Sequence, residues 1–157
     1  MKDPTSSVVS LAFSLLFLSL ISGYGQKTNS VQWTFAGEPV RQNESILKIT
    51  ADISPGWHLY SQTIGEGGPR PTRIFFEETN EFVLVGSAEE KGDPTKLRDE
   101  TYEMEIIWYS GTVTFLQKIR LNQPVTFIKG RVEYMTCNNY VCIPDKQDFI
   151  FNLQPPK

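Results

Sequence analysis

Apolar and polar side chains alternate with a period of two residues along several stretches of the chain. In segment 45–53, SILKITADI, one side of the expected strand carries Leu47, Ile49, Ala51 and Ile53. The same alternation recurs over residues 112–121 and 148–153. A period of two is typical of a β-strand with one buried face, and no long stretch has the 3.6-residue period of a helix. The sequence therefore predicts an all-β protein.

Turn-forming residues separate these stretches at short intervals. Pro, Gly, Asn, Asp and Ser gather at positions 54–56, 65–71, 92–94, 110–111 and 122–124. About seven to nine short strands with this spacing predict an immunoglobulin-like antiparallel β-sandwich, and a small barrel is the alternative. Helical structure is expected to be limited to a short turn at most, in residues 86–100.

Residues 1–25 have the order of a secretory signal peptide. A lysine precedes an apolar run from Val8 to about Ile21, and small residues follow up to Gly25. The run has about 14 residues, whereas a membrane-spanning helix needs roughly 20, so a retained anchor is the less favoured alternative. We expect cleavage after Gly25, which leaves residues 26–157 as one exported domain.

The remaining chain fits a single domain that can bury a core. Its formal net charge of −3 is far from the strongly basic balance of nucleic-acid-binding domains, so we expect no nucleic-acid partner. No later stretch is long and apolar enough to suggest a membrane span in the mature chain.

The chain has two cysteines, Cys137 and Cys142, with four residues between them. Asn138 and Asn139 favour a turn, and a four-residue hairpin loop would place the cysteines opposite each other at a separation that a disulfide accepts. The ring would contribute roughly 2 kcal/mol of stability, against about 4.7 kcal/mol for a ring of about 100 residues. A small exposed ring is either a redox-active disulfide or a local structural clip, and residue chemistry leaves both open.

Metal binding is a third alternative. Zinc needs four ligands, or three and a water molecule, and the chain offers two cysteines, a single histidine, His58, and scattered carboxylates. A Cu(I) site would add Met135 or Met104 to the two thiolates. In an exported protein a disulfide is the simpler outcome, so we predict neither a metal nor another cofactor.

The cysteine segment resembles a motif of a known family. VEYMTCNNYVCIPDK, residues 132–146, is similar to the cysteine hairpin in the N-terminal periplasmic domain of the thiol:disulfide interchange protein DsbD. That motif runs aromatic, two residues, Cys, a short loop, Cys, one residue and Pro. The matching positions here are Tyr134, Cys137, Cys142 and Pro144.

Two other segments resemble the same family, and the likeness covers most of residues 31–153. PGWHLYSQ, residues 55–62, is similar to an early strand whose aromatics pack near the cysteines: Tyr60 matches the second aromatic, and His58 stands where an aromatic is frequent. RDETYEMEIIWYSGTVTF, residues 98–115, is similar to a cap loop and the strand after it. The family's two acids and its shielding aromatic fall at Asp99, Glu100 and Tyr102.

The resemblance implies an electron-carrying domain. In the family a membrane electron-transfer protein reduces the cysteine pair, which then reduces periplasmic disulfide isomerases or the thioredoxin-like proteins of cytochrome c biogenesis. It also implies that Cys142 forms the mixed disulfide with a partner and that Cys137 resolves it, with Tyr102 as a lid over the sulfurs. The alternative is a non-catalytic immunoglobulin-like binding module in which the disulfide stiffens a recognition loop.

The sequence also departs from the family. Four residues separate its cysteines instead of five, and Asp145 stands where a second proline is frequent. The membrane domain and the thioredoxin-like domain of the family are not in the sequence, so we expect a stand-alone module. Independently of the family, Tyr60, Tyr102 and Tyr134 are expected to be strand-face or core aromatics, and Asp99 and Glu100 to lie in a solvated turn.

Overall fold

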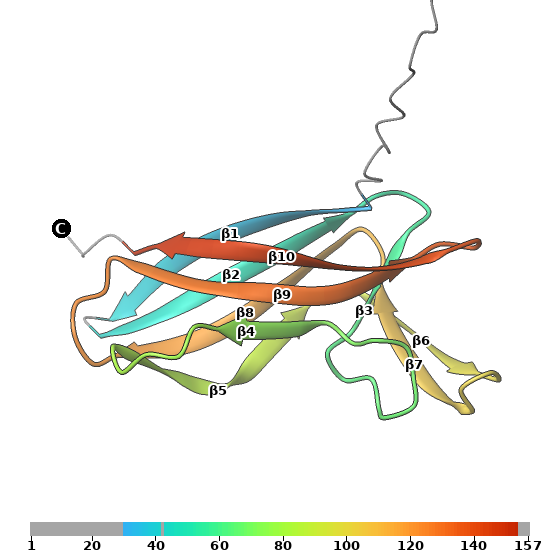
Figure 1. Ribbon diagram of the computed structural model, residues 1–157, viewed down its shortest axis with the longest axis horizontal. Coiled ribbons are helices and arrows are strands. Elements are labelled where there is room, and N and C mark those ends of the chain that lie inside the picture. The colour runs from blue at the N-terminus through green and yellow to red at the C-terminus, as the bar shows by residue number, and fades with distance from the viewer. Residues whose placement is uncertain (1–29, 42, 154–157) are drawn as a thin grey trace, which may run out of the picture.

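The computed structural model describes residues 30–41 and 43–153, so the expected signal peptide lies outside the described residues. This part of the chain has ten β-strands and no helix, and hence none that could cross a membrane. All strand pairs are antiparallel and form two sheets that stack on each other (Figure 1). The predicted immunoglobulin-like sandwich is confirmed, with more strands than the seven to nine expected from the sequence.

The first sheet has the strand order β1–β2–β8–β5. Its strands are β1 (Val31–Arg41), β2 (Glu44–Ile53), β8 (Thr112–Leu121) and β5 (Phe82–Lys91). Strands β2 and β8 cover the predicted segments 45–53 and 112–121, and the predicted apolar side of β2 is buried. The alternating pattern therefore assigned both the strand and its inward face correctly.

The second sheet has the order β10–β9–β3–β7–β6, and β4 also pairs with β9. Its strands are β3 (His58–Tyr60), β4 (Arg73–Phe76), β6 (Pro94–Asp99), β7 (Met104–Tyr109), β9 (Phe127–Cys137) and β10 (Cys142–Asn152). Most of the predicted strand 148–153 lies in β10. Strand β9 is the centre of this sheet, because β10 runs along one edge and β4 and β3 share the other.

The main core lies between the two sheets and is built from alternating residues of the long strands. Phe115 and Phe151 are the largest fully buried side chains in it. Gln117 occupies a buried position in the apolar row of β8. Its amide nitrogen donates hydrogen bonds to the carbonyl oxygens of Gly86, at 3.2 Å, and Lys118, at 2.8 Å, so the buried polar group is satisfied.

Residues 86–100 contain no helical turn and form strands that no alternation in the sequence predicted. Strand β5 continues to Lys91, and β6 fills residues 94–99. The register of β5 against β8 shifts between Val85 and Glu89, where Gly86 has a φ of 69°. This bulge interrupts the alternation, and β6 is exposed along almost its whole length. Neither segment therefore carries a period-two pattern that the sequence could display.

Two hairpins extend from the same end of the sandwich: β9–β10, the cysteine hairpin, and β6–β7, the cap hairpin (Figure 1). Half-buried Glu90 of β5 ties the base of the cap hairpin to the first sheet. Its carboxylate accepts hydrogen bonds from Ser61 Oγ and the Gln62 N–H, both at 2.7 Å, and from the Tyr109 hydroxyl at 2.8 Å. Burial, followed by the bond to Glu90, raises the pKa of Tyr109 above its ordinary value.

Candidate functional site: the cysteine hairpin

Cys137 and Cys142 form a disulfide where β9 and β10 meet. The two residues are direct partners in the antiparallel ladder, and their Cα atoms are 4.1 Å apart. This opposition agrees with the prediction from the four-residue loop and its two asparagines. The ladder that aligns them extends over the whole length of both strands.

The four-residue loop is held by the side chain of Asn138. Its Oδ1 accepts hydrogen bonds from the N–H groups of Tyr140 and Val141, at 2.8 and 2.9 Å, and its own N–H donates to the Val141 carbonyl at 3.0 Å. Side chains of Asn commonly hold turns in this way. Among the described residues Glu103 is the only non-glycine residue with a positive φ, so the loop does not use the left-handed backbone that Asn also tolerates. Tyr140 is 94% exposed at the tip of the loop.

The two cysteines differ sharply in their surroundings. Cys137 is 2% exposed and forms a small cluster with Tyr60 and Ile106, whereas Cys142 is exposed. Four partly buried residues complete this satellite cluster: Ile64, Met104, Trp108 and Met135. An attacking thiolate therefore has access to Cys142, while apolar side chains cover Cys137.

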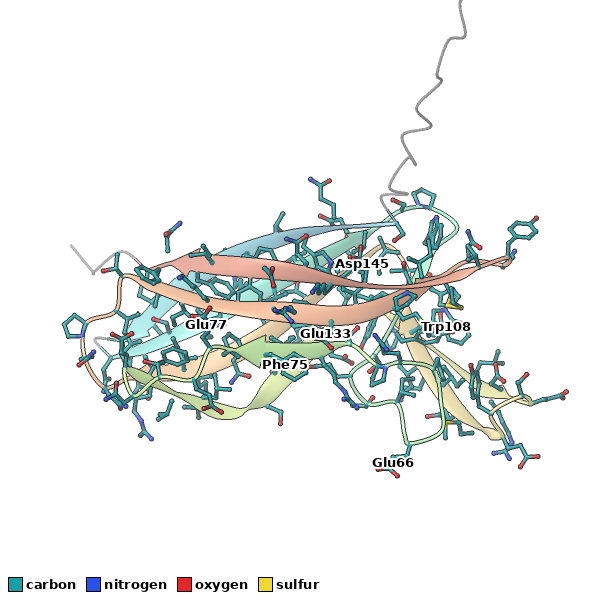
Figure 2. The ribbon with its side chains drawn as sticks, viewed as in Figure 1. Glu66, Phe75, Glu77, Trp108, Glu133 and Asp145 are labelled. Carbon is teal, nitrogen blue, oxygen red and sulfur yellow. A yellow bond between two sulfur atoms is a disulfide. The ribbon has the colours of Figure 1, made fainter. Side chains whose placement is uncertain are left out.

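The short strand β3 brings His58 beside the disulfide. His58 is the ladder partner of Cys137, and its half-buried ring lies 5.2 Å from Trp108 and 5.3 Å from Tyr60, measured between ring centroids. Figure 2 shows Trp108 at the same end of the molecule as the disulfide. The Nε2 atom of His58 is 3.4 Å from the Tyr60 hydroxyl. Burial lowers the pKa of His58, so its imidazole is neutral at pH 7.

Tyr60 links the satellite cluster to the cap hairpin. It is buried, and its ladder partner is Trp108 on β7. Burial raises the pKa of Tyr60, and the nearby Tyr102 and Asp99 raise it further. The structure thus places Tyr60 near Asp99 and Tyr102, which lie in a separate segment of the chain, the turn of the cap hairpin.

Asp99 has a clear structural task in the turn of the cap hairpin. Its Oδ1 accepts hydrogen bonds from the N–H groups of Thr101 and Tyr102, at 2.8 and 3.2 Å. Glu100 is exposed, as expected of a solvated turn, and Tyr102 is 41% exposed. The hydrogen bonds and ring contacts of the described residues do not join this turn to either cysteine. A lid function of Tyr102 therefore stays a prediction.

Tyr134 and Pro144 lie on the cysteine hairpin but differ in position. Tyr134 is 4% exposed in the main core, where its ring contacts Trp33, and adjacent strand residues face opposite sides. It therefore points to the other face of β9 from Cys137 and belongs to the core rather than to the surroundings of the disulfide. Pro144 is exposed on β10 opposite Met135. Because β10 is an edge strand of its sheet, the missing N–H of a proline is tolerated there.

Sequence reasoning missed two parts of this site. The hydrogen bonds of Glu90 could not be predicted, because a single carboxylate in a charged stretch gives no indication of its partners. In the sequence Met104 stands out only as a possible copper ligand, and Ile106 has no distinguishing feature. The alternation of Met104, Ile106 and Trp108 along residues 104–109 could have indicated a buried face there. In the described part of the chain, no group of three or more His, Cys, Asp or Glu side chains could hold a metal ion.

A comparison with protein families shows to which family this chain belongs. The model of the family "Thiol:disulfide interchange protein DsbD, N-terminal" matches residues 27–154. The chain belongs to the DsbD N-terminal domain family. The family and the Cys137–Cys142 disulfide together support thiol–disulfide interchange as the activity at the family level.

Solved structures share the fold of this DsbD-family domain. The N-terminal periplasmic domain of ScsB from Proteus mirabilis is 19% identical, with a TM-score of 0.54, and the match covers 80% of this chain and 47% of that one. The chain thus spans about half the length of that structure. The reduced N-terminal domain of DsbD from Neisseria meningitidis is 11% identical, with a TM-score of 0.50 and coverage of 80% and 92%. No curated protein matches the sequence.

Proposed function

We propose that this DsbD-family domain is an exported electron-transfer module. It accepts electrons from a membrane electron-transfer protein and passes them to exported thioredoxin-like proteins or disulfide isomerases through Cys137 and Cys142. The proposal includes residues 1–25 as a cleaved signal peptide, with residues 26–157 working in the periplasm or a similar oxidising compartment. It needs no metal or other cofactor.

The observation that carries the proposal is the unequal exposure of the two cysteine residues. Thiol–disulfide exchange needs a thiolate to reach one sulfur of the disulfide, and which sulfur is attacked depends on access. Cys142 is exposed and Cys137 is 2% exposed. Cys142 is therefore the residue that forms the mixed disulfide with each partner, and Cys137 is the resolving thiol.

The exchange reactions balance with these two roles. A donor thiolate attacks Cys142 Sγ, the Cys137–Cys142 bond breaks, and its electron pair leaves on Cys137 Sγ. The second donor thiol then releases the domain in its dithiol form and becomes oxidised. In the next half-reaction Cys142 attacks the disulfide of an acceptor, and Cys137 attacks the resulting mixed disulfide, which restores the ring and releases the acceptor as a dithiol.

A redox titration of the mature domain tests the proposal. Structural disulfides of secreted proteins typically have reduction potentials below about −300 mV, whereas redox-active disulfides have higher reduction potentials. We expect the Cys137–Cys142 pair to equilibrate with glutathione or dithiothreitol buffers at a potential above that limit. A pair that stays oxidised in strongly reducing dithiol buffers would instead identify a passive clip in a binding module.

A lid at Tyr102 predicts a change in the oxidation rate. Tyr102→Ala should accelerate oxidation of the reduced domain by hydrogen peroxide by about threefold or more, because the rate follows the access of the oxidant to the thiolate. Leu97→Ala is the matched control, since Leu97 is an exposed apolar residue of the same hairpin, 54% accessible. Equal rates for both variants and the parent domain would remove Tyr102 from the site.

A further inference from the structure

Three side chains form a row across the second sheet at the disulfide. Cys142 pairs with Cys137 in the β10–β9 ladder, and Cys137 pairs with His58 in the β9–β3 ladder. Directly opposed residues in antiparallel strands point to the same face, with Cβ atoms about 4.5–5.5 Å apart. The side chain of His58 therefore leaves the sheet on the same face as that of Cys137 and next to it, on the side away from Cys142.

The buried sulfur has few groups with which to exchange a proton. A thiolate at Cys137 would form among apolar side chains, where desolvation disfavours the charge. The other residues of β7 on this face, Met104, Ile106 and Trp108, carry no charge, and neither does Met135 on β9. Tyr60 is the one other titratable member of the satellite cluster, and its raised pKa keeps its phenol protonated at neutral pH.

We propose that His58 exchanges the proton of Cys137 during disulfide formation and opening. This inference rests on the proposed function, because it requires the Cys137–Cys142 bond to open in use. When Cys137 attacks a mixed disulfide at Cys142, the neutral imidazole accepts the thiol proton, the ring bond forms, and the partner leaves as a thiolate. In the reverse reaction His58 first takes up a proton from solvent, and the imidazolium donates it to Cys137 as this sulfur leaves.

The surroundings of His58 suit this task. Burial lowers its pKa, and no charged group contributes to the shift, so the imidazole is unprotonated and able to accept a proton at pH 7. The contact of 3.4 Å between Nε2 and the Tyr60 hydroxyl, together with the Trp108 ring, holds the imidazole in place. The acidic and phenolic groups of the cap turn, Asp99 and Tyr102, raise the pKa of Tyr60. His58 is also the only histidine of the chain, so no second imidazole can replace it.

The two steps of exchange can be separated with 5,5′-dithiobis(2-nitrobenzoate) in a stopped-flow experiment. The reduced domain releases one thionitrobenzoate when Cys142 attacks the reagent and a second when Cys137 resolves the mixed disulfide. In His58→Gln and His58→Phe we expect the second phase to slow about tenfold or more at pH 7, within the usual range for loss of a general base. The first phase should change by less than about twofold, and the second phase should regain the parent rate at high pH, where the thiol ionises without help.

Controls separate a proton-transfer function from packing. Glutamine keeps a polar side chain and phenylalanine keeps an aromatic ring, so a shared loss identifies the basic nitrogen. Trp108→Phe alters the packing on His58 and should leave the pH profile unchanged in shape. Second-phase rates within twofold of the parent from pH 6 to 10 in both His58 variants overturn the inference while leaving the proposed function intact. A parent domain whose disulfide cannot be opened by reductant overturns both.

Discussion

Cys142→Ala should abolish disulfide exchange with protein partners, whereas Cys137→Ala should accumulate a stable mixed disulfide. The reason is the difference in accessibility: Cys142 is exposed, and Cys137 is covered by Tyr60 and Ile106. Without Cys137, the domain has no thiol that can resolve the adduct formed by Cys142. Without Cys142, the remaining thiol cannot be reached by a folded partner.

A thioredoxin variant that keeps only its attacking cysteine, activated as a mixed disulfide with thionitrobenzoate, is a suitable probe, because no second partner thiol can release the adduct. The adduct can be followed by electrophoresis without reductant. We expect a one-to-one adduct with Cys137→Ala that dithiothreitol dissolves, and none above background with Cys142→Ala. The two variants serve as controls for each other, because each retains one thiol and loses the ring. Equal adduct yields from both variants would show that the burial of Cys137 does not decide which cysteine reacts with the partner. A higher yield from Cys142→Ala would make Cys137 the attacking cysteine and Cys142 the resolving one.

Gly130→Ala should produce the largest loss of stability of any alanine substitution at a described glycine. Gly130 lies in β9 opposite Phe76 of β4. A Cβ atom at this position would lie 2.2 Å from the carbonyl oxygen of Phe75 and 2.4 Å from Cζ of Phe149. The first of these is a backbone atom, so a simple change of side-chain rotamer cannot relieve the clash. Figure 2 shows Phe75 and Glu77 along this part of the sheet, well away from the disulfide.

We expect Gly130→Ala to lower the free energy of unfolding by about 3 kcal/mol or more, at the upper end of the usual range for overpacking, because β4 must move away from β9. Urea denaturation followed by tryptophan fluorescence measures the change. Gly65→Ala is the matched control: its Cβ would meet only Met104 Cε, at 3.7 Å, which is an ordinary contact. A loss below about 1 kcal/mol for Gly130→Ala would mean that β4 can shift without breaking its pairing with β9.

Much of the fold followed from local patterns. The alternation in β2 and β8 predicted the strands and their buried sides, because the direction of a side chain in a strand depends on its position in the sequence and little else. The alternation failed in residues 86–100, where the bulge at Gly86 shifts the register and β6 is exposed on both faces. The strands β3 and β4 are too short for a period to be visible.

Some features of the candidate site could also be predicted from local sequence, and others could not. The opposition of Cys137 and Cys142 is a property of one hairpin, and residues 134–146 contain everything needed to predict it. The family resemblance placed Tyr60, Asp99 and Tyr102 in one region, and the structure does bring these three together. Tyr134 lies on the face of β9 that packs in the main core, opposite the face that carries Cys137. Its closeness to Cys137 in sequence therefore does not place it beside the sulfur.

The sequence by itself determined that this chain forms strands with known buried faces and that its two cysteines meet at the end of a hairpin, because both depend on interactions between near neighbours. Only the tertiary structure decided which sulfur is covered and which side chain lies next to it. Cys137 is buried because β3 and β7 arrive from distant parts of the chain, and the same arrangement brings His58 to its side. Contacts of this kind depend on how sheets assemble, and no local pattern records them.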